Sequence, residues 1–182
     1  ILPNLKKIDA YELVGVATKT PASAKQIAEK YGFAYATADW KEIVEDKNID
    51  AVIIATRHDL HAKLVVEAAK HDKDVFVEKP LALNEKQLKQ AINAVRRHGV
   101  NLLVGFNRRF SPLACAAKEV LDKREGEVMI NLVVNAGKLP LDHWAYDPEE
   151  GGGRIIGEAC HFFDLANFFV DSCKYVSVSA KS

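Results

Sequence analysis

The sequence predicts an α/β fold in which a doubly wound parallel sheet is followed by part of a second α/β domain with an open mixed sheet. Short apolar runs alternate with helical patterns over the first 110 residues. Strands separated by helices in this way join as parallel neighbours through crossover connections. After Phe110 the alternation stops and longer irregular segments begin. We therefore expect a domain boundary near Phe110, with domains at residues 1–110 and 111–182.

Four runs in the first domain have the length and composition of buried strands. Each is short, apolar and partly β-branched, and polar or turn-forming residues bound it on both sides. The expected strands are residues 11–17, 51–56, 74–77 and 101–105.

The helices between these strands begin at recognisable capping residues. Thr20 precedes Pro21, which is favoured in a first helical turn, and Asn84 stands three residues before Gln87, as in a capping box. Asp39 opens a shorter helix. Glycines that can end two of the helices are Gly32 and Gly99. The inward face of the helix after residue 56 is expected to consist of Leu60, Leu64, Val65 and Ala68.

The second domain lacks the regular rhythm of the first. Ser111 and Pro112 form a cap and a first-turn proline, and a run of three glycines interrupts the later part of the chain. The elements expected here are a helix over residues 111–122, a strand over 128–135, an irregular stretch over 137–153, a helix over 158–170 and a strand over 174–180. We expect this domain to be incomplete, because the last strand lacks partners.

The composition excludes several classes of function. Lysine plus arginine equals aspartate plus glutamate, with 25 of each, so no basic stripe favours nucleic acid or a membrane surface. The apolar runs are far too short to span a bilayer. Cys115, Cys160 and Cys173 lack paired spacing, and we interpret them as reduced thiols of a cytoplasmic protein. Cys160 beside His161 resembles a nucleophile with its base, but adjacent helical residues point about 100° apart, which favours a buried thiol.

The start of the chain reads as the inside of a helix already under way, so we expect the chain to be a fragment. Dinucleotide-binding folds carry a G-x-G-x-x-G turn between their first strand and first helix. None of the ten glycines forms this pattern. The phosphate-binding turn is therefore expected before residue 1, which makes residues 11–17 the second strand of such a fold.

The end of that second strand bears on the choice of cofactor. An acidic residue there hydrogen-bonds the ribose 2′-hydroxyl of NAD, whereas a cation accommodates the 2′-phosphate of NADP. The segment contains no acid and one cation, Lys19, next to Thr18. This pattern favours NADP over NAD, although Lys19 can equally be a solvated surface charge.

The run Glu78-Lys79-Pro80 directly follows the strand at residues 74–77. Ligands of open α/β sheets bind at the carboxyl ends of the strands. A lysine at such an end can donate a proton to a reacting group or accept one from it. The alternative is a strand that simply ends in solvated charge.

Another strand end, Ala55-Thr56, is small enough for a cofactor to approach the backbone closely. His58 and His61 follow and, together with His71, suggest a metal site. No cysteine pair or suitably spaced third ligand supports that interpretation, so we predict no metal. His61 is expected to hydrogen-bond across the site instead.

Four segments in the same order resemble the Gfo/Idh/MocA family, which includes glucose–fructose oxidoreductases and inositol dehydrogenases. These segments are Ala55-Thr56, Glu78-Lys79-Pro80, residues 104–110 and residues 151–164. Residues 147–158 further resemble the branch found in bi-domain sugar oxidoreductases, where such a domain follows one similar to alcohol dehydrogenases. The resemblance covers nearly the whole chain, from about residue 2 to residue 180.

The resemblance implies a Rossmann domain, here truncated, and a C-terminal α/β domain whose open sheet often mediates oligomerisation. Proteins of this family bind NAD or NADP and move hydride to or from a carbon of a sugar or polyol. The family's lysine matches Lys79 and its histidine matches His161, both close to the reacting hydroxyl. An aspartate usually stands four residues before that histidine, where this chain has Gly157. We expect Glu158, one helical turn before His161, to orient the imidazole.

The other expected site residues form two groups. The expected cofactor-binding residues are Thr18, Lys19, Ala55, Thr56, Arg57, His58, His61, Glu78, Lys79, Pro80 and Asn107. The expected substrate-binding residues are Arg108, His143 and Trp144. Structural alternatives stay open: the charged residues can lie at the surface, and Trp144 can pack its loop. His161 can be a core histidine packed among Phe162 and Phe163, with Asp164 capping or pairing with it.

These observations predict an NAD(P)-dependent oxidoreductase that transfers hydride between a nicotinamide and a sugar, nucleotide-sugar or polyol. Oxidation of the alcohol needs a base for the hydroxyl proton, and Lys79 and His161, one from each domain, are the expected pair. One alternative is a non-catalytic dinucleotide-binding or scaffold member of the fold, which Gly157 keeps open. A second alternative is redox-assisted glycoside cleavage. A homo-oligomer that associates through the C-terminal sheet is also expected.

Overall fold

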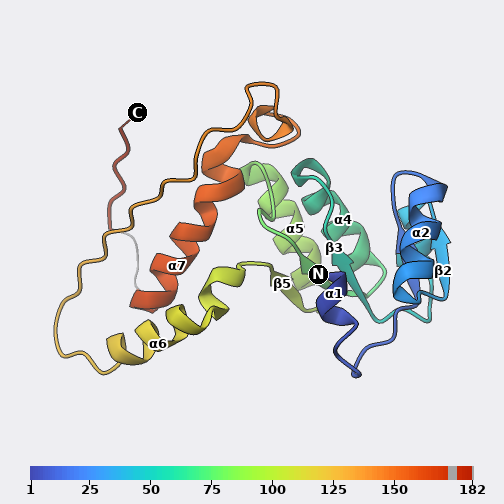
Figure 1. Ribbon diagram of the computed structural model, residues 1–182, viewed down its shortest axis with the longest axis horizontal. Coiled ribbons are helices and arrows are strands. Elements are labelled where there is room, and N and C mark those ends of the chain that lie inside the picture. Colours follow the sequence, from blue (N-terminus) through green and yellow to red (C-terminus); the bar gives the residue numbers. More distant parts are fainter. Residues whose placement is uncertain (172–175, 182) are drawn as a thin grey trace.

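The computed structural model describes residues 1–171 and 176–181 (Figure 1). Its strands are β1 (Gly15–Ala17), β2 (Tyr35–Thr37), β3 (Ala51–Ile54), β4 (Asp74–Val77) and β5 (Leu102–Val104). Its α-helices are α1 (Leu2–Leu5), α2 (Pro21–Tyr31), α3 (Trp40–Glu45), α4 (His58–Lys70), α5 (Glu85–His98), α6 (Pro112–Leu121) and α7 (Cys160–Val170). Two short 3-10 segments, η1 (Asn107–Phe110) and η2 (Trp144–Tyr146), and a π-helical segment, η3 (Ile155–Ala159), complete the description.

The strands form parallel sheets with helical connections, which confirms the predicted α/β class. Strands β3, β4 and β5 form one sheet in that order, with Val52 opposite Val75 and Val77 opposite Val104. Strands β1 and β2 form a separate parallel pair, so the five strands divide into two sheets where one sheet was expected. No strand in the described part of the chain lies hydrogen-bonded between β1 and β3. Figure 1 shows the β1–β2 pair and α2 standing apart from the larger sheet.

The sequence prediction misplaced one strand of this first part and missed another. The strand expected at residues 11–17 begins only at Gly15, and Tyr11 is 65% exposed. Strand β2 was not predicted, because its three residues are too few to show a period of two.

The apolar core lies between the β3–β4–β5 sheet and the helices α4 and α5. Its central side chains are Val52, Ile54, Leu64, Val65, Val75, Val77 and Ala91. Burying each of the larger ones stabilises the fold by about 1.5–3 kcal/mol relative to exposure. Leu60 was expected in this core but is 39% exposed, while His61 is fully buried. The register of α4 therefore places an imidazole where the periodicity predicted a leucine.

Capping interactions begin the helices where the sequence predicts them. Thr20 Oγ1 accepts a hydrogen bond from the Ser23 amide at 3.3 Å, and Asn84 Oδ1 accepts one from the Gln87 amide at 2.9 Å. Gln87 Oε1 in turn accepts from the Leu83 amide at 2.9 Å, one residue before the position that a capping box uses. The glycines expected to end α2 and α5, Gly32 and Gly99, have φ angles of 84° and 70°.

The chain after β5 contains helices but no strand among the residues that the structure describes. Helices α6 and α7 lie side by side, and the segment between α6 and η2 runs around them as an extended loop (Figure 1). The strand predicted at residues 128–135 is therefore wrong: the segment is unpaired, and Met129 and Val133 are 93% and 89% exposed. Residues 176–180 of the other expected strand are also unpaired, and residues 174–175 lie outside the described part. An alternating pattern forms a strand only when a neighbour receives its backbone hydrogen bonds.

Two further expectations concern the cysteines and the membrane. Cys115 and Cys160 are free thiols, and Cys173 lies outside the described residues. Burial raises the pKa of the Cys160 thiol, which opposes the thiolate that a nucleophile needs. Within residues 1–171 and 176–181, no helix combines the length and apolar character required to cross a membrane.

Candidate active site

Lys79 follows β4 at the carboxyl edge of the larger sheet and joins this edge to η3, the segment directly before the helix that carries His161. Its Nζ donates a hydrogen bond to the backbone carbonyl of Gly157 at 2.5 Å. The Lys79–Pro80 peptide bond is cis. At the end of the next strand, a Cβ on Gly105 would lie 3.1 Å from Glu78 Oε2, so the missing side chain lets β5 end beside this carboxylate.

His161 lies in the first turn of α7 and is 8% exposed. Its Nδ1 is the only buried side-chain nitrogen or oxygen in the described part of the chain that lacks a hydrogen-bond partner. Burial, followed by the positive charges of Lys79 and Arg108, lowers the pKa of His161 below its ordinary value, and the imidazole is therefore neutral at neutral pH. Because Gly157 precedes His161 by one helical turn, the Lys79 ammonium and this imidazole belong to one site.

The two carboxylates near His161 are bound to arginines instead. Glu158 Oε2 accepts hydrogen bonds from Nε and Nη2 of Arg154 at 2.8 and 2.5 Å. Asp164 forms a bidentate ion pair with Arg109, whose Nε donates to Oδ2 at 2.9 Å. The hydrogen bond expected from Glu158 to His161 is absent among the described residues, and the pairing of Asp164 with Arg109 was not predicted. Their 55-residue separation leaves no local signal in the sequence.

His61 lies across the site between two carbonyl oxygens, as was expected of it, and a neutral ring, with its single N–H, donates to one of them at a time. Its Nδ1 lies 2.8 Å from the Pro80 carbonyl oxygen and its Nε2 lies 3.0 Å from the Thr56 carbonyl oxygen. The ring is completely buried. It therefore ties the end of β3 to the segment after β4, which holds Lys79.

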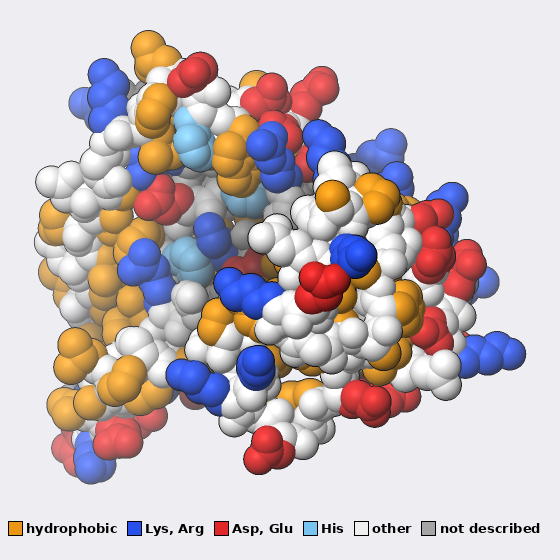
Figure 2. Space-filling view, turned by 45° about the vertical axis from the view of Figure 1, so that its right-hand side comes forward, with side chains coloured by type: hydrophobic (Ala, Val, Ile, Leu, Met, Phe, Trp, Pro, Cys, Tyr) orange, Lys and Arg blue, Asp and Glu red, His pale blue; other side chains and the backbone are white. Residues whose placement is uncertain are grey.

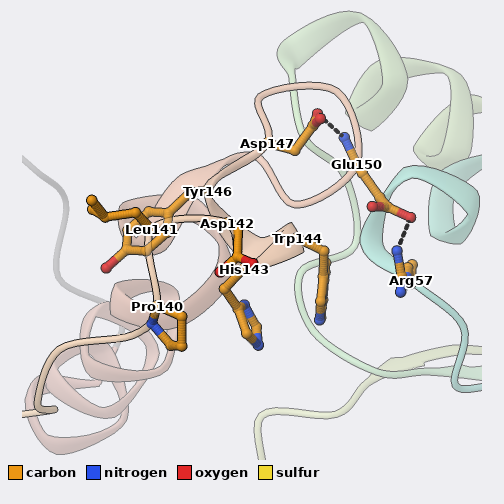
Figure 3. Close-up of a pocket in the computed structure, with 9 residues that line it drawn as sticks. All are labelled: Arg57, Pro140, Leu141, Asp142, His143, Trp144, Tyr146, Asp147 and Glu150. Carbon is orange, nitrogen blue, oxygen red and sulfur yellow. Dashed lines mark hydrogen bonds and ion pairs between the residues drawn. The ribbon is translucent and has the colours of Figure 1, made fainter.

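His58 and Trp144 connect this centre to an open pocket of about 760 Å³. The His58 ring meets Trp144 edge to face, with ring centroids 4.8 Å apart. The Arg57 guanidinium lies over the same indole at 5.3 Å from its centre and forms an ion pair with Glu150. Figure 3 shows Trp144 between His143 and Arg57, with Glu150, farther along the same segment as Trp144, extending to Arg57.

The glycine run holds this loop against the site. A Cβ on Gly151 would lie 2.5 Å from the backbone of Trp144 and Ala145. Gly152 and Gly153 have φ angles of 72° and 76°, a region that L-residues rarely adopt. The run thereby brings the Gly151 carbonyl to 2.8 Å from Nδ1 of His58, a contact that the sequence did not predict.

The expected cofactor-binding residues occupy the carboxyl ends of several strands. Ala55 and Thr56 lie exposed after β3, and Asn107 lies exposed after β5, at the same edge as Lys79. Thr18 and Lys19 follow β1 in the smaller sheet, where the Thr18 hydroxyl donates to the Thr20 carbonyl at 3.0 Å. The structure thus groups the residues after β3, β4 and β5 and leaves the pair after β1 in the other sheet.

Arg108, expected to bind substrate, is exposed, and its guanidinium lies over the Phe162 ring at 4.6 Å from the ring centre. On the face shown in Figure 2, histidine side chains and several lysine or arginine side chains surround a hollow. Within the described ranges, no three histidine, cysteine, aspartate or glutamate side chains come together as a metal site would require.

The match to a family profile covers the larger sheet and the smaller one. A profile described as an oxidoreductase family with an NAD-binding Rossmann fold matches residues 2–106, more than half of the chain. The chain belongs to the Gfo/Idh/MocA family. The resemblance that its four motifs indicated is thereby confirmed.

Several relatives of this Gfo/Idh/MocA chain are named as dehydrogenases. Inositol 2-dehydrogenase from Rhizobium meliloti (strain 1021) is 36% identical over 171 residues, covering 92% of this chain and 50% of that protein. The crystal structure of a probable dehydrogenase from Thermotoga maritima has a TM-score of 0.77 at 29% identity, covering 92% of this chain and 50% of that one. Levoglucosan dehydrogenase in complex with NADH and levoglucosan has a TM-score of 0.74 at 29% identity, covering 87% of this chain and 45% of that one. The chain thus spans about half the length of these relatives.

The lowered histidine pKa values predict how stability depends on pH. His58 and His161 have pKa values below the ordinary 6.5, chiefly because of burial. The unfolded chain then binds more protons than the folded chain as the pH falls below 6.5, so the free energy of unfolding decreases there and levels off below the folded pKa. We expect urea unfolding between about pH 8 and about pH 5 to show this decrease, and replacement of both histidines by glutamine to flatten it.

Carboxylates act in a separate pH window. Hydrogen bonds from Asn48 and Asn101 hold the carboxyl pKa values of Asp46 and Asp74 below 3.8. The stability that these two carboxylates provide is therefore lost only when the pH falls below that value.

A free energy of unfolding that stays constant from about pH 8 to about pH 5 would contradict the prediction for the two histidines.

Proposed function

We propose that this chain is part of an NAD(P)-dependent dehydrogenase that transfers hydride between the nicotinamide and a CH–OH carbon of a sugar, nucleotide-sugar or polyol. The observation that carries the proposal is the buried, unpartnered Nδ1 of His161, one helical turn from the carbonyl that binds Lys79. Native proteins rarely leave a buried polar atom unsatisfied, so such an atom points to a ligand. A substrate hydroxyl is a ligand of the required kind.

The two side chains have complementary roles in this proposal. The neutral imidazole of His161 accepts the hydroxyl proton during oxidation and returns it during reduction. Lys79 spends one of its three N–H donors on Gly157, and the others stabilise negative charge that develops on the substrate oxygen. The bound nicotinamide supplies the hydride chemistry. Residues 1–110 would hold the cofactor and residues 111–182 would contribute to the substrate side and to a homo-oligomer.

The residues at the carboxyl ends of the strands fit a dinucleotide. Ala55, Thr56 and Asn107 leave exposed backbone at the edge where Lys79 lies, and levoglucosan dehydrogenase, similar in fold, was solved with NADH. For this chain we favour NADP, since Lys19 is the only charged residue at the end of β1. Lys19→Glu should then shift the ratio of affinities toward NADH, measured by calorimetric titration with both reduced cofactors.

The main rival is a dinucleotide-binding or scaffold protein without turnover, which Gly157 in the place of the family's aspartate favours. The test is to incubate the protein at its full natural length with NAD⁺ or NADP⁺ and a panel of sugars and polyols. Absorbance of the reduced nicotinamide should grow with at least one substrate. Tight cofactor binding without any such growth, in either direction, would support the scaffold. Product analysis separates oxidation from glycoside cleavage.

The 182 residues alone should bind NADPH weakly. None of the ten glycines forms the turn that brings pyrophosphate to a helix N-terminus, which is a main source of dinucleotide affinity. Isothermal titration should therefore give a dissociation constant of about 1 mM or weaker, near the low end of measurable affinities. Micromolar binding by these residues would show that the other strand ends suffice for recognition.

A further inference from the structure

The imidazole of His58 occupies the space that a side chain at position 157 would need. A Cβ built on Gly157 lies 2.9 Å from Cε1 and 3.3 Å from Nδ1 of His58, and the first distance is shorter than real contacts allow. Gly157 is buried, and its carbonyl binds Lys79. His58 therefore stands directly beside the lysine site, and it does so because residue 157 has no side chain.

A hydrogen bond fixes the tautomer of His58. The Gly151 carbonyl can only accept, so Nδ1 of His58, 2.8 Å away, carries the proton. In the neutral ring Nε2 is then an acceptor. This nitrogen has no hydrogen bond to the described residues, and it is not among their buried unsatisfied atoms, so solvent or a ligand can reach it.

The surroundings keep this acceptor neutral and in place. Burial, then the charges of His61 and Lys79, lower the pKa of His58, while the Gly151 hydrogen bond and Asp59 act in the opposite direction. Trp144 fixes the ring from the pocket side, with Arg57 over the same indole. The ring thus lies against Gly157, whose carbonyl binds Lys79, and against Trp144, which lines the open pocket.

We propose that Nε2 of His58 accepts a hydrogen bond from a second hydroxyl of the substrate, adjacent to the hydroxyl held by Lys79 and His161. The inference rests on the proposed function and refines it: the preferred substrates are vicinal diols, as in cyclic polyols and pyranoses. The reacting hydroxyl meets the lysine and His161, and its neighbour meets His58 on the side of Trp144. His58 thereby determines specificity without exchanging a proton.

Two variants of His58 separate its two nitrogens. Asparagine can keep an N–H near the position of Nδ1, and with it the bond to Gly151, while removing the acceptor. Glutamine can place an amide oxygen near the position of Nε2 while losing the bond to Gly151. The probes are myo-inositol and glucose, each compared with derivatives that lack one hydroxyl next to the reacting carbon.

Deletion of the second hydroxyl should lower the affinity and kcat/KM of the parent protein by about 10-fold, the worth of one hydrogen bond. In His58→Asn the same deletion should change them by less than about 2-fold, with His58→Gln intermediate. Affinity is measured by calorimetry with the protein at its full natural length and reduced cofactor present, so it reports on His58 even without turnover. The protein could show no turnover and still lose affinity for the deoxy derivatives only when His58 is present. That result would overturn the proposed function and leave this inference standing.

An equal penalty in parent and His58→Asn overturns the inference, as does failure of every diol to bind. A rise in the nicotinamide KM with an unchanged diol penalty would assign His58 to the cofactor instead, which also overturns it. Gly157→Ala tests the geometry separately. It should lower the melting temperature of the parent, because its Cβ collides with the imidazole, and should have little effect in His58→Asn.

Discussion

Lys79→Ala should reduce kcat by about 10²- to 10³-fold, the range typical for loss of one donor that stabilises negative charge on a reacting oxygen. The variant removes the ammonium that binds the Gly157 carbonyl, one helical turn before His161. The fold should change little, because one hydrogen bond contributes only about 0.5–1.5 kcal/mol. Steady-state kinetics with the protein at its full natural length gives the rate, and thermal unfolding gives the stability.

Lys86→Ala is the matched control, because Lys86 carries the same charge but lies exposed in the first turn of α5. Its rate should equal that of the parent. A Lys79→Ala enzyme with the parent rate would remove Lys79 from the mechanism. A large fall in melting temperature would instead assign Lys79 a structural role at the contact with η3.

Local rules predicted where the helices begin, because a helix start follows from adjacent residues. Thr20, Asp39, Asn84 and Ser111 each cap the helix that they were expected to begin. Helix capping depends on side chains within three residues, and the sequence displays these directly. Strands depend on distant neighbours. Residues 128–135 have a strand-like pattern but no hydrogen-bonded neighbour in the described part of the chain, so they do not form a strand.

In the site, too, the sequence indicated the residues that lie in local motifs but not the contacts between distant residues. The sequence indicated Lys79 and His161, because a motif at a strand end and a motif on a helix are each local. It did not indicate what the carboxylates do: Glu158 binds Arg154, and Asp164 binds Arg109. The contact between His58 and Gly151 spans 93 residues and depends on the backbone of the glycine run. Pairings of this kind arise only from tertiary packing, so the sequence alone does not predict them.

The bidentate ion pair between Arg109 and Asp164 links η1 to α7, and its loss should destabilise the fold strongly. The Asp164 side chain is 9% exposed and Arg109 is 34% exposed, so removal of the carboxylate charge leaves a partly desolvated guanidinium without its partner. Breaking a fully buried pair costs about 3–5 kcal/mol, and the partial exposure of Arg109 places Asp164→Asn near about 2–3 kcal/mol. Urea unfolding measures this loss.

The same variant should also act on His161, because the negative charge of Asp164 raises the imidazole pKa against the larger lowering by burial. Asp164→Asn should therefore lower the His161 pKa further, which an NMR titration of the ring detects. Glu29→Gln provides the matched control, since it makes the same chemical change in an exposed pair with Lys25 whose side chains are 69% and 77% exposed. That pair should contribute no more than about 0.5 kcal/mol. If both variants lose equal stability and the His161 titration does not move, η1 and α7 are held together by packing alone, and Asp164 has no electrostatic influence on the proposed proton acceptor.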